Sequence, residues 1–250
     1  MTTSGSASFN LDLNDIVEEA YERVGIEVRT GYEHRTARRS LNLLFADWAN
    51  RGINLWTIEQ GSLNLTQGEP TYALPVDTVD LLEHVIRTGA GDISTQADLT
   101  ITRISVSTYA TIPNKLSQGR PIQVWINRQT GAEYPPGGRP AGTNPATGIL
   151  PPNINVWPTP DGSQPYQFVY WRMRRIQDAG GGVNTQDIPF RFLPCLVAGL
   201  SYYLALKVPE AYNRLADLKV MYDEAWELAA SEDREKAPDR LVPRRMYISG

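Results

Sequence analysis

The chain has 250 residues, a formal net charge of −4 and a single cysteine. This length allows one large domain or two small ones with a substantial core. The acidic balance argues against general nucleic-acid binding through charge, and one cysteine excludes an intramolecular disulfide framework and a cysteine-rich zinc site. Because no signal-peptide pattern and no bilayer-length apolar stretch stand out, we expect a soluble protein made in the cytoplasm that meets no membrane.

Two amphipathic helices are predicted in residues 12–53, after a polar and flexible segment 1–11. Apolar residues between 12 and 24 share one helical face, and Gly25 is expected to end that helix. The second helix is expected from about residue 31 to Gly52. Its exposed face is basic, whereas the exposed face of the first helix is acidic, so we expect these charges to pair within a subunit or between copies. The paired residues would be Glu18, Glu22, Arg35 and Arg39.

Residues 54–178 change character and predict strands. Short β-rich runs separated by turn residues favour an antiparallel sandwich or small barrel, with one helical turn at 105–112. The segment 129–152 is rich in Gly and Pro without periodicity, which indicates a long projecting loop. The expected strands are 55–59, 62–66, 80–87, 99–104, 122–127, 154–157 and 166–173.

The chain then returns to helices through a Gly-rich linker, residues 179–186, which we expect to be flexible. A third helix is predicted to start at Asp187, with Pro189 in its first turn, and its nearly continuous apolar surface predicts that it forms the buried centre. A fourth helix is predicted over 210–235 and an extended basic tail over 236–250. The fold class is therefore α+β: an antiparallel four-helix bundle from both ends of the chain, with an inserted antiparallel β domain.

Candidate catalytic groups are few, and we predict no catalytic, cofactor-binding or metal site. His34 and His84 lack metal-ligand spacing and are expected to be solvated or hydrogen-bonded, and Cys195 lies in an apolar helix as an inert core residue. Gly180-Gly181-Gly182 lacks the context of a phosphate loop. The acidic clusters at 18–22 and 223–227 are expected to be solvated helix faces.

Aromatic residues gather in the strand-rich region. Alternating strands would bury most of them, although an exposed row could instead stack on sugars or form an interface. Trp48 and Trp226, on helices, are expected in the core. The strand-region set is Trp56, Trp125, Trp157 and Trp171 with Tyr72, Tyr134, Tyr166 and Tyr170.

A series of short segments, in order along nearly the whole chain, resembles the head-to-tail adaptor (connector) proteins of short-tailed bacteriophages. Each segment is weak alone, and the ordered set is more specific. The loop 129–152 has no counterpart in this resemblance. The segments are ARRSLNLL (37–44), WANRGINLW (48–56), YALP (72–75), YATIPNK (109–115), GRP (119–121), VWPTPD (156–161), IPFRF (188–192), EDRE (232–235) and VPRR (242–245).

The resemblance implies a ring, typically of twelve copies, in the virion neck between the portal protein and the tail nozzle protein. Double-stranded DNA would pass through its lumen without sequence-specific binding, and the acidic balance suits such sliding. The resemblance also implies that the C-terminal tail contacts the portal through Arg240, Arg244, Arg245 and Tyr247.

Three alternatives stay open. The tail could pack on its own or a neighbouring subunit. The loop 129–152, with Tyr134 and Arg139, is expected to face the nozzle or a neighbour, but it could be a decorative insertion. The protein could also be a glycan-binding or glycan-hydrolysing tail component, or a tail-completion protein that stays monomeric.

Overall fold

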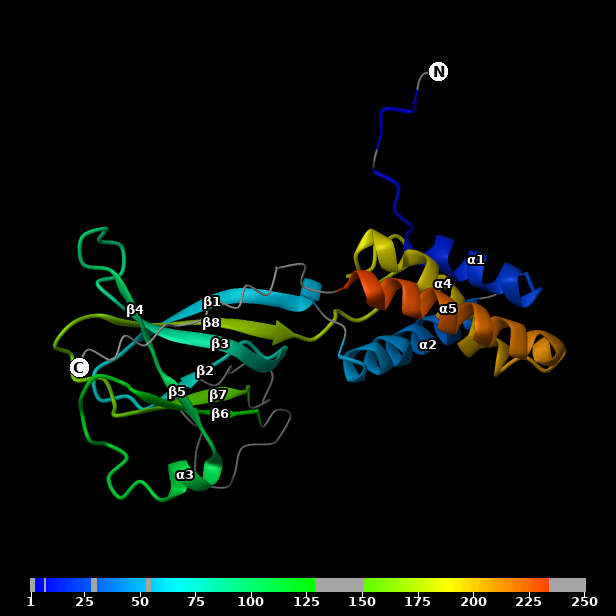
Figure 1. The fold of residues 1–250 in the computed structure, drawn as a ribbon. Coiled ribbons are helices and arrows are strands. Elements are labelled where there is room, and N and C mark those ends of the chain that lie inside the picture. The colour runs from blue at the N-terminus through cyan, green and yellow to red at the C-terminus, as the bar shows by residue number, and fades with distance from the viewer. Residues whose placement is uncertain (1–2, 7, 28–30, 53–54, 129–150, 234–250) are drawn as a thin grey trace, which may run out of the picture. The chain divides into compact units, whose positions relative to one another are not determined.

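The computed structural model describes residues 3–6, 8–27, 31–52, 55–128 and 151–233. The chain divides into two compact units, each with its own internal contacts (Figure 1). The helical unit combines Met1–Leu55 with Asp178–Gly250, and the inserted unit is Trp56–Gln177. The chain is therefore α+β, with helices from both ends of the sequence in one unit.

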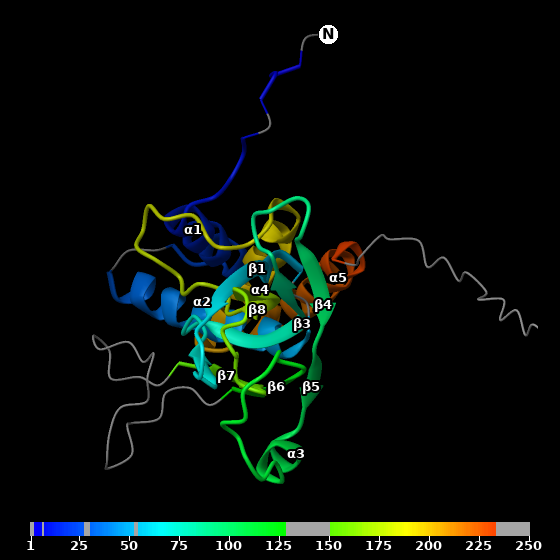
Figure 2. The same ribbon diagram turned by 90° about the vertical axis from the view of Figure 1, so that its left-hand side faces the viewer.

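Four helices make up the body of the helical unit: α1 (Leu13–Val24), α2 (Gly31–Asn50), α4 (Leu193–Ala205) and α5 (Leu215–Glu232). Helix α4 packs against the other three and lies between α1 and α5 (Figure 2). Most of its residues are buried, because apolar side chains cover nearly its whole circumference. The prediction that this helix forms the buried centre is confirmed.

Helix α1 begins and ends where its sequence signals indicate. Asp12 and Asp15 form a reciprocal capping box at its start. Gly25 ends it in the left-handed conformation, with φ of 91°, and its N–H donates to the carbonyl of Tyr21. The expected end at Gly25 is confirmed, because a residue without a Cβ adopts this conformation at little cost.

The predicted starts of the last two helices are wrong. Asp187 caps no α-helix: a 3-10 turn, η2 (Phe190–Phe192), follows Pro189, and α4 begins only at Leu193 with Pro194 in its first turn. A proline is tolerated in that first turn alone, so Pro194 fixes the start. The last helix begins at Leu215 after a second 3-10 segment, η3 (Pro209–Arg214).

The Gly-rich segment before α4 is tied to the start of α1. The N–H groups of Leu13 and Asn14 donate to the carbonyls of Asn184 and Gly182, at 3.1 Å each. These N–H groups belong to the first turn of α1 and have no partner within the helix, so the returning chain supplies their acceptors. The sequence predicted a flexible linker here and did not predict that Gly182 and Asn184 would bind the start of α1.

The inserted unit contains two four-stranded sheets, one in the order β1-β8-β3-β4 and the other in the order β2-β7-β6-β5. All pairs are antiparallel except β5–β6, which is parallel, so the expectation of a purely antiparallel domain is wrong at this edge. Ser105 caps the short helix α3 (Val106–Ala110), which confirms the expected helical turn. The strands are β1 (Ile58–Leu65), β2 (Thr71–Ala73), β3 (Thr78–Thr88), β4 (Ala97–Thr100), β5 (Thr102–Ile104), β6 (Gln123–Asn127), β7 (Asn153–Trp157) and β8 (Tyr166–Arg174).

One hydrophobic cluster holds the two sheets together. Leu81, Ile86 and Phe168 contribute from the first sheet, and Val124 and Ile154 from the second. These side chains are almost completely buried, and burial alternates along β6, as a strand with one face on a core requires. The run expected as one strand at 99–104 is divided between β4 and β5, which belong to different sheets.

Candidate interaction surfaces

An aromatic cluster joins α2, η2 and α5 inside the helical unit. The indole Nε1 of Trp48 donates to the hydroxyl of Tyr222 at 3.0 Å. Ring centroids of Phe192 and Trp226 lie 5.6 and 5.5 Å from that of Trp48. The guanidinium of Arg51 lies 4.7 Å above Trp226, which is half-buried and not a full core residue as expected. Burial raises the pKa of Tyr222, so its hydroxyl stays protonated.

A buried carboxylate ties three separate segments together beside this cluster. Asp233 follows the last turn of α5, and its side chain is fully buried. One of its oxygens accepts a hydrogen bond from Arg191 at 2.5 Å, and the other accepts from the N–H of Leu55 at 3.3 Å. Asp233, the last described residue, is therefore held next to Leu55, where the chain leaves the helical unit.

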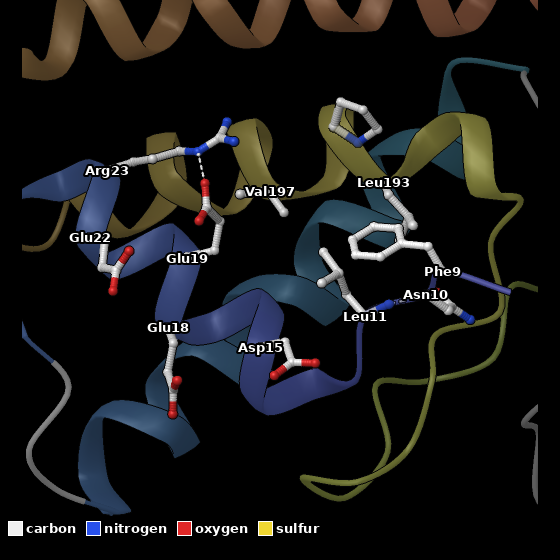
Figure 3. Close-up of a pocket in the computed structure, with 11 residues that line it drawn as sticks. Phe9, Asn10, Leu11, Asp15, Glu18, Glu19, Glu22, Arg23, Leu193 and Val197 are labelled. Atoms are coloured by element: carbon white, nitrogen blue, oxygen red, sulfur yellow. Dashed lines mark hydrogen bonds and ion pairs between the residues drawn. The ribbon is translucent and has the colours of Figure 1, made fainter. Parts of the chain in front are cut away.

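An acidic groove runs along α1 and the start of α4, with a volume of about 600 Å³ (Figure 3). Apolar side chains gather at one end of it, and carboxylates follow α1 along its length. Among them, Glu19 is paired with Arg23 at 2.8 Å, whereas Glu18 and Glu22 are exposed and bind no partner among the described residues. The residues that line this acidic groove are Phe9, Asn10, Leu11, Asp15, Glu18, Glu19, Glu22, Arg23, Leu193, Pro194 and Val197.

The basic residues predicted to pair with these acids do not reach them within one chain. Arg35 and Arg39 are exposed on α2, and within the described ranges no ion pair joins them to Glu18 or Glu22. Pairing of these four charges between copies is not tested by a single chain and stays a prediction.

A second cavity, also of about 600 Å³, lies between α2 and the end of α4 and was not anticipated from the sequence. Leu43 and Leu204 form part of its wall together with Arg39 and Lys207. The ammonium of Lys207 donates to Ser40 Oγ at 2.6 Å. Burial, and then the charge of Arg39, lower the pKa of Lys207.

The tryptophans of the inserted unit are half-buried, so the expectation that they lie in the core is only partly met. Trp125 stacks on Tyr109 with ring centroids 5.1 Å apart, and Trp157 Nε1 donates to the carbonyl of Asn114 at 3.0 Å. The tyrosines of β2 and β8 fill the core in their place: Tyr72, Tyr166 and Tyr170 are buried. Trp125 and Trp157 are thus engaged in contacts within the inserted unit.

Carboxylates near this region are engaged with arginines. Arg172, whose side chain is 11% exposed, donates to Asp77 at 2.6 Å and to Glu59 at 2.8 Å. Burial tends to raise the pKa of Asp77, but the hydrogen bonds and charge of Arg172 outweigh it, and the pKa is lowered. A glycosidase needs a carboxyl group with a raised pKa as its general acid, so Asp77 is unsuited to that role.

The remaining candidate groups behave as follows. Cys195 is buried, and burial raises its pKa to about 12, which agrees with an inert core thiol. His84 stacks on Phe168, and neither of its ring nitrogens has a hydrogen-bond partner within the described structure, so the expectation of a solvated or bonded imidazole is wrong there. The described residues contain no group of three or more side chains that could hold a metal ion.

Two sets of predicted contact residues lie outside the described residues. Tyr134 and Arg139 belong to 129–150, and the tail residues Arg240, Arg244, Arg245 and Tyr247 belong to 234–250.

A protein-family model described as SU10 adaptor protein matches residues 12–244 of the chain. The chain belongs to this family. It is a phage adaptor, and the resemblance seen in the sequence is confirmed. Membership implies a structural protein of the virion neck that interacts with portal and tail components. No curated protein matches the chain.

Three of the adaptor segments noticed in the sequence meet in the helical unit. Segment 48–56 supplies Trp48 and Leu55, segment 188–192 supplies Arg191, and segment 232–235 supplies Asp233. Residues that are more than 170 positions apart, such as Leu55 and Asp233, are thus in direct contact. Within the described part of this adaptor, no helix is long and apolar enough to cross a membrane.

Proposed function

We propose that this adaptor assembles into a ring, with twelve copies, between the portal protein and the tail nozzle protein, where it extends the DNA channel and catalyses no reaction. The observation that carries this proposal is the family match, which runs through both compact units and into the tail at residue 244. The helical unit would serve as an antiparallel four-helix bundle and the inserted unit as a β-sandwich.

Lateral contacts of the ring would use the unpaired charges of α1 and α2. Glu18 and Glu22 are exposed without partners in the described structure, and Arg35 and Arg39 are exposed on another helix. In a closed ring the same patch on each copy meets a different patch on its neighbour, so two oppositely charged faces can pair around the whole circle. Such pairs supply orientation more than affinity.

The two segments outside the described residues would make the axial contacts. Arg240, Arg244, Arg245 and Tyr247 of the tail would bind the portal, because arginine forks and apolar anchors suit an extended segment that orders on binding. Tyr134 and Arg139 would face the nozzle. DNA would slide through an acidic lumen without sequence-specific contacts.

Native mass spectrometry of the adaptor alone and with its purified portal tests the proposal. We expect a closed ring of twelve adaptors only when the portal is present. The variant Arg244→Glu/Arg245→Glu should fail to bind the portal, while Arg35→Glu/Arg39→Glu should bind it but fail to close the ring. Unchanged assembly by both variants would refute the assigned contacts, and a protein that joins the portal as single copies would favour tail completion.

A further inference from the structure

The acidic groove on α1 and α4 has the chemistry of a binding site for a basic and apolar peptide. Its apolar lining includes the side chains of Leu11, Leu193 and Val197. Carboxylates of α1 line the rest of it, and Glu18 and Glu22 have no cationic partner within the described chain. An occupant that covers the apolar side chains and also neutralises the acids must carry both apolar and positively charged side chains.

The chain's own C-terminal tail has this composition. Residues 236–250 contain four basic residues against Asp239 as their single acid, and Pro238 and Pro243 prevent a continuous helix. The basic residues are Lys236, Arg240, Arg244 and Arg245, and the apolar ones include Leu241, Val242, Met246, Tyr247 and Ile248.

The tail begins at the end of α5, which is tied to the segment just before α4. Asp233 is bound to Arg191, which stands two residues before Leu193 in the groove wall. The neighbouring Phe190 contacts Phe9, another wall residue, with ring centroids 6.4 Å apart. Figure 1 shows the end of α5 and the start of α1 at the same end of the helical unit.

The length of the tail is sufficient to follow the groove. An extended segment of residues 234–250 spans at most about 60 Å, whereas the acidic stretch of α1 from Asp15 to Arg23 rises by about 12 Å. Because the tail is tethered so near, its effective concentration at the groove is on the order of millimolar, well above that of a second copy in dilute solution.

We propose that in the free adaptor subunit residues 236–250 dock into the acidic groove of their own helical unit. The guanidinium groups of Arg244 and Arg245 then neutralise Glu18 and Glu22, while apolar tail residues cover the side chains of Leu11, Leu193 and Val197. The docked tail shields the acids of α1 from other cations.

For assembly, and only if the proposed function holds, this docking makes ring closure depend on the portal. The tail covers the same acids that the ring seam would use, so free subunits do not associate. When the portal binds the tail, Glu18 and Glu22 become available to Arg35 and Arg39 of a neighbour. Because the portal binds only the undocked tail, it shifts the equilibrium from the docked to the undocked subunit.

Disulfide trapping in the full-length chain tests where the tail lies. The pair Glu18→Cys with Tyr247→Cys should form an intramolecular disulfide rapidly, and the native Cys195 does not interfere because it is buried with a raised pKa. The pair Asp223→Cys with Tyr247→Cys is the matched control, since Asp223 is exposed on α5 and outside the groove lining. Equal rates for the two pairs, or a disulfide only between chains, would overturn the proposal.

Protection of the tail from an arginine-specific protease provides the second measurement. We expect Glu18→Lys/Glu22→Lys to accelerate cleavage after Arg244 about tenfold, the change that a loss of about 1.4 kcal/mol of docking energy produces. Asp223→Lys/Glu224→Lys should leave the rate unchanged. If the lysine pair disturbs α1, Glu18→Gln/Glu22→Gln removes the same charges at similar size. Equal cleavage of all variants would contradict docking.

Neither assay contains the portal, so its outcome is separate from that of the proposed function. A docked tail that never binds the portal would refute the portal assignment alone, and a portal-binding tail that is freely cleaved in the free subunit would refute the docking alone.

Discussion

Gly199 in the central helix α4 faces side chains of both α2 and α5. Replacing it with alanine brings two opposing effects on stability into play. A Cβ at this position would lie 2.9 Å from Leu44 Cδ2 and 2.9 Å from Tyr222 Cε2. Carbon atoms do not approach so closely, so a neighbour must move. Leu44 is fully buried, and Tyr222 is fixed by its hydrogen bond with Trp48, so neither yields easily.

The magnitude follows from the difference between the two effects. Alanine in a helix interior is favoured over glycine by about 1 kcal/mol, whereas overpacking a close-packed core costs about 1–3 kcal/mol. We therefore expect Gly199→Ala to lower the free energy of unfolding by about 1 kcal/mol. For a chain of this size this corresponds to a fall in Tm of about 2–4 °C.

Urea unfolding followed by circular dichroism would measure this change. Gly31→Ala is the matched control, because a Cβ at the first residue of α2 meets no atom within 4 Å, and its stability should not fall. Leu44→Val removes the δ-carbons that clash, so combining it with Gly199→Ala should cost less than the sum of the two single changes. A rise in stability for Gly199→Ala alone would show that the neighbouring side chains move freely and refute the reasoning.

Three further changes probe other contacts. Trp48→Phe removes the donor to the Tyr222 hydroxyl and part of the ring contacts, and urea unfolding should show a loss of about 2 kcal/mol; a loss below about 0.5 kcal/mol would contradict a central role for this cluster. Arg172→Met should destabilise the inserted unit by about 2 kcal/mol in the same assay, and Arg172→Lys should recover less than half of it, because an ammonium cannot bridge two carboxylates as a planar fork does; full recovery would argue against the fork. Burial lowers the pKa of His84 below its ordinary value of 6.5, so its contribution to stability is complete above that pH and is lost as the pH falls through the lower folded-state value. Thermal unfolding of His84→Phe should accordingly change less than that of the wild type between about pH 7 and pH 5, and parallel profiles would exclude the imidazole as the cause.

Local signals in the sequence predicted the elements that local physics decides. The end of α1 at Gly25 depends on one left-handed residue, and the buried position of α4 depends on its continuous apolar surface, so both were accessible without a structure. The start of α4 was misplaced because Asp187 and Pro189 form a plausible cap. Pro194 could have corrected it, since its ring excludes a helix that begins five residues or more earlier.

Contacts between distant residues were beyond the sequence. The hydrogen bond between Trp48 and Tyr222 spans 174 positions, and that between Leu55 and Asp233 spans 178. Nothing in the local sequence of these residues indicates their partners. They meet because α2 and α5 both pack against α4. The acidic groove could not be predicted for the same reason, because its lining combines residues 9–23 with the start of α4.

The two places where the chain crosses between its units are both fastened inside the helical unit. Leu55 donates to Asp233 as the chain departs, and on its return Ala179 donates to Asn42 Oδ1 at 2.8 Å. The exit and re-entry points therefore do not depend on what residues 56–177 contain. The inserted unit can therefore be exchanged as a cassette while the helical body keeps its geometry.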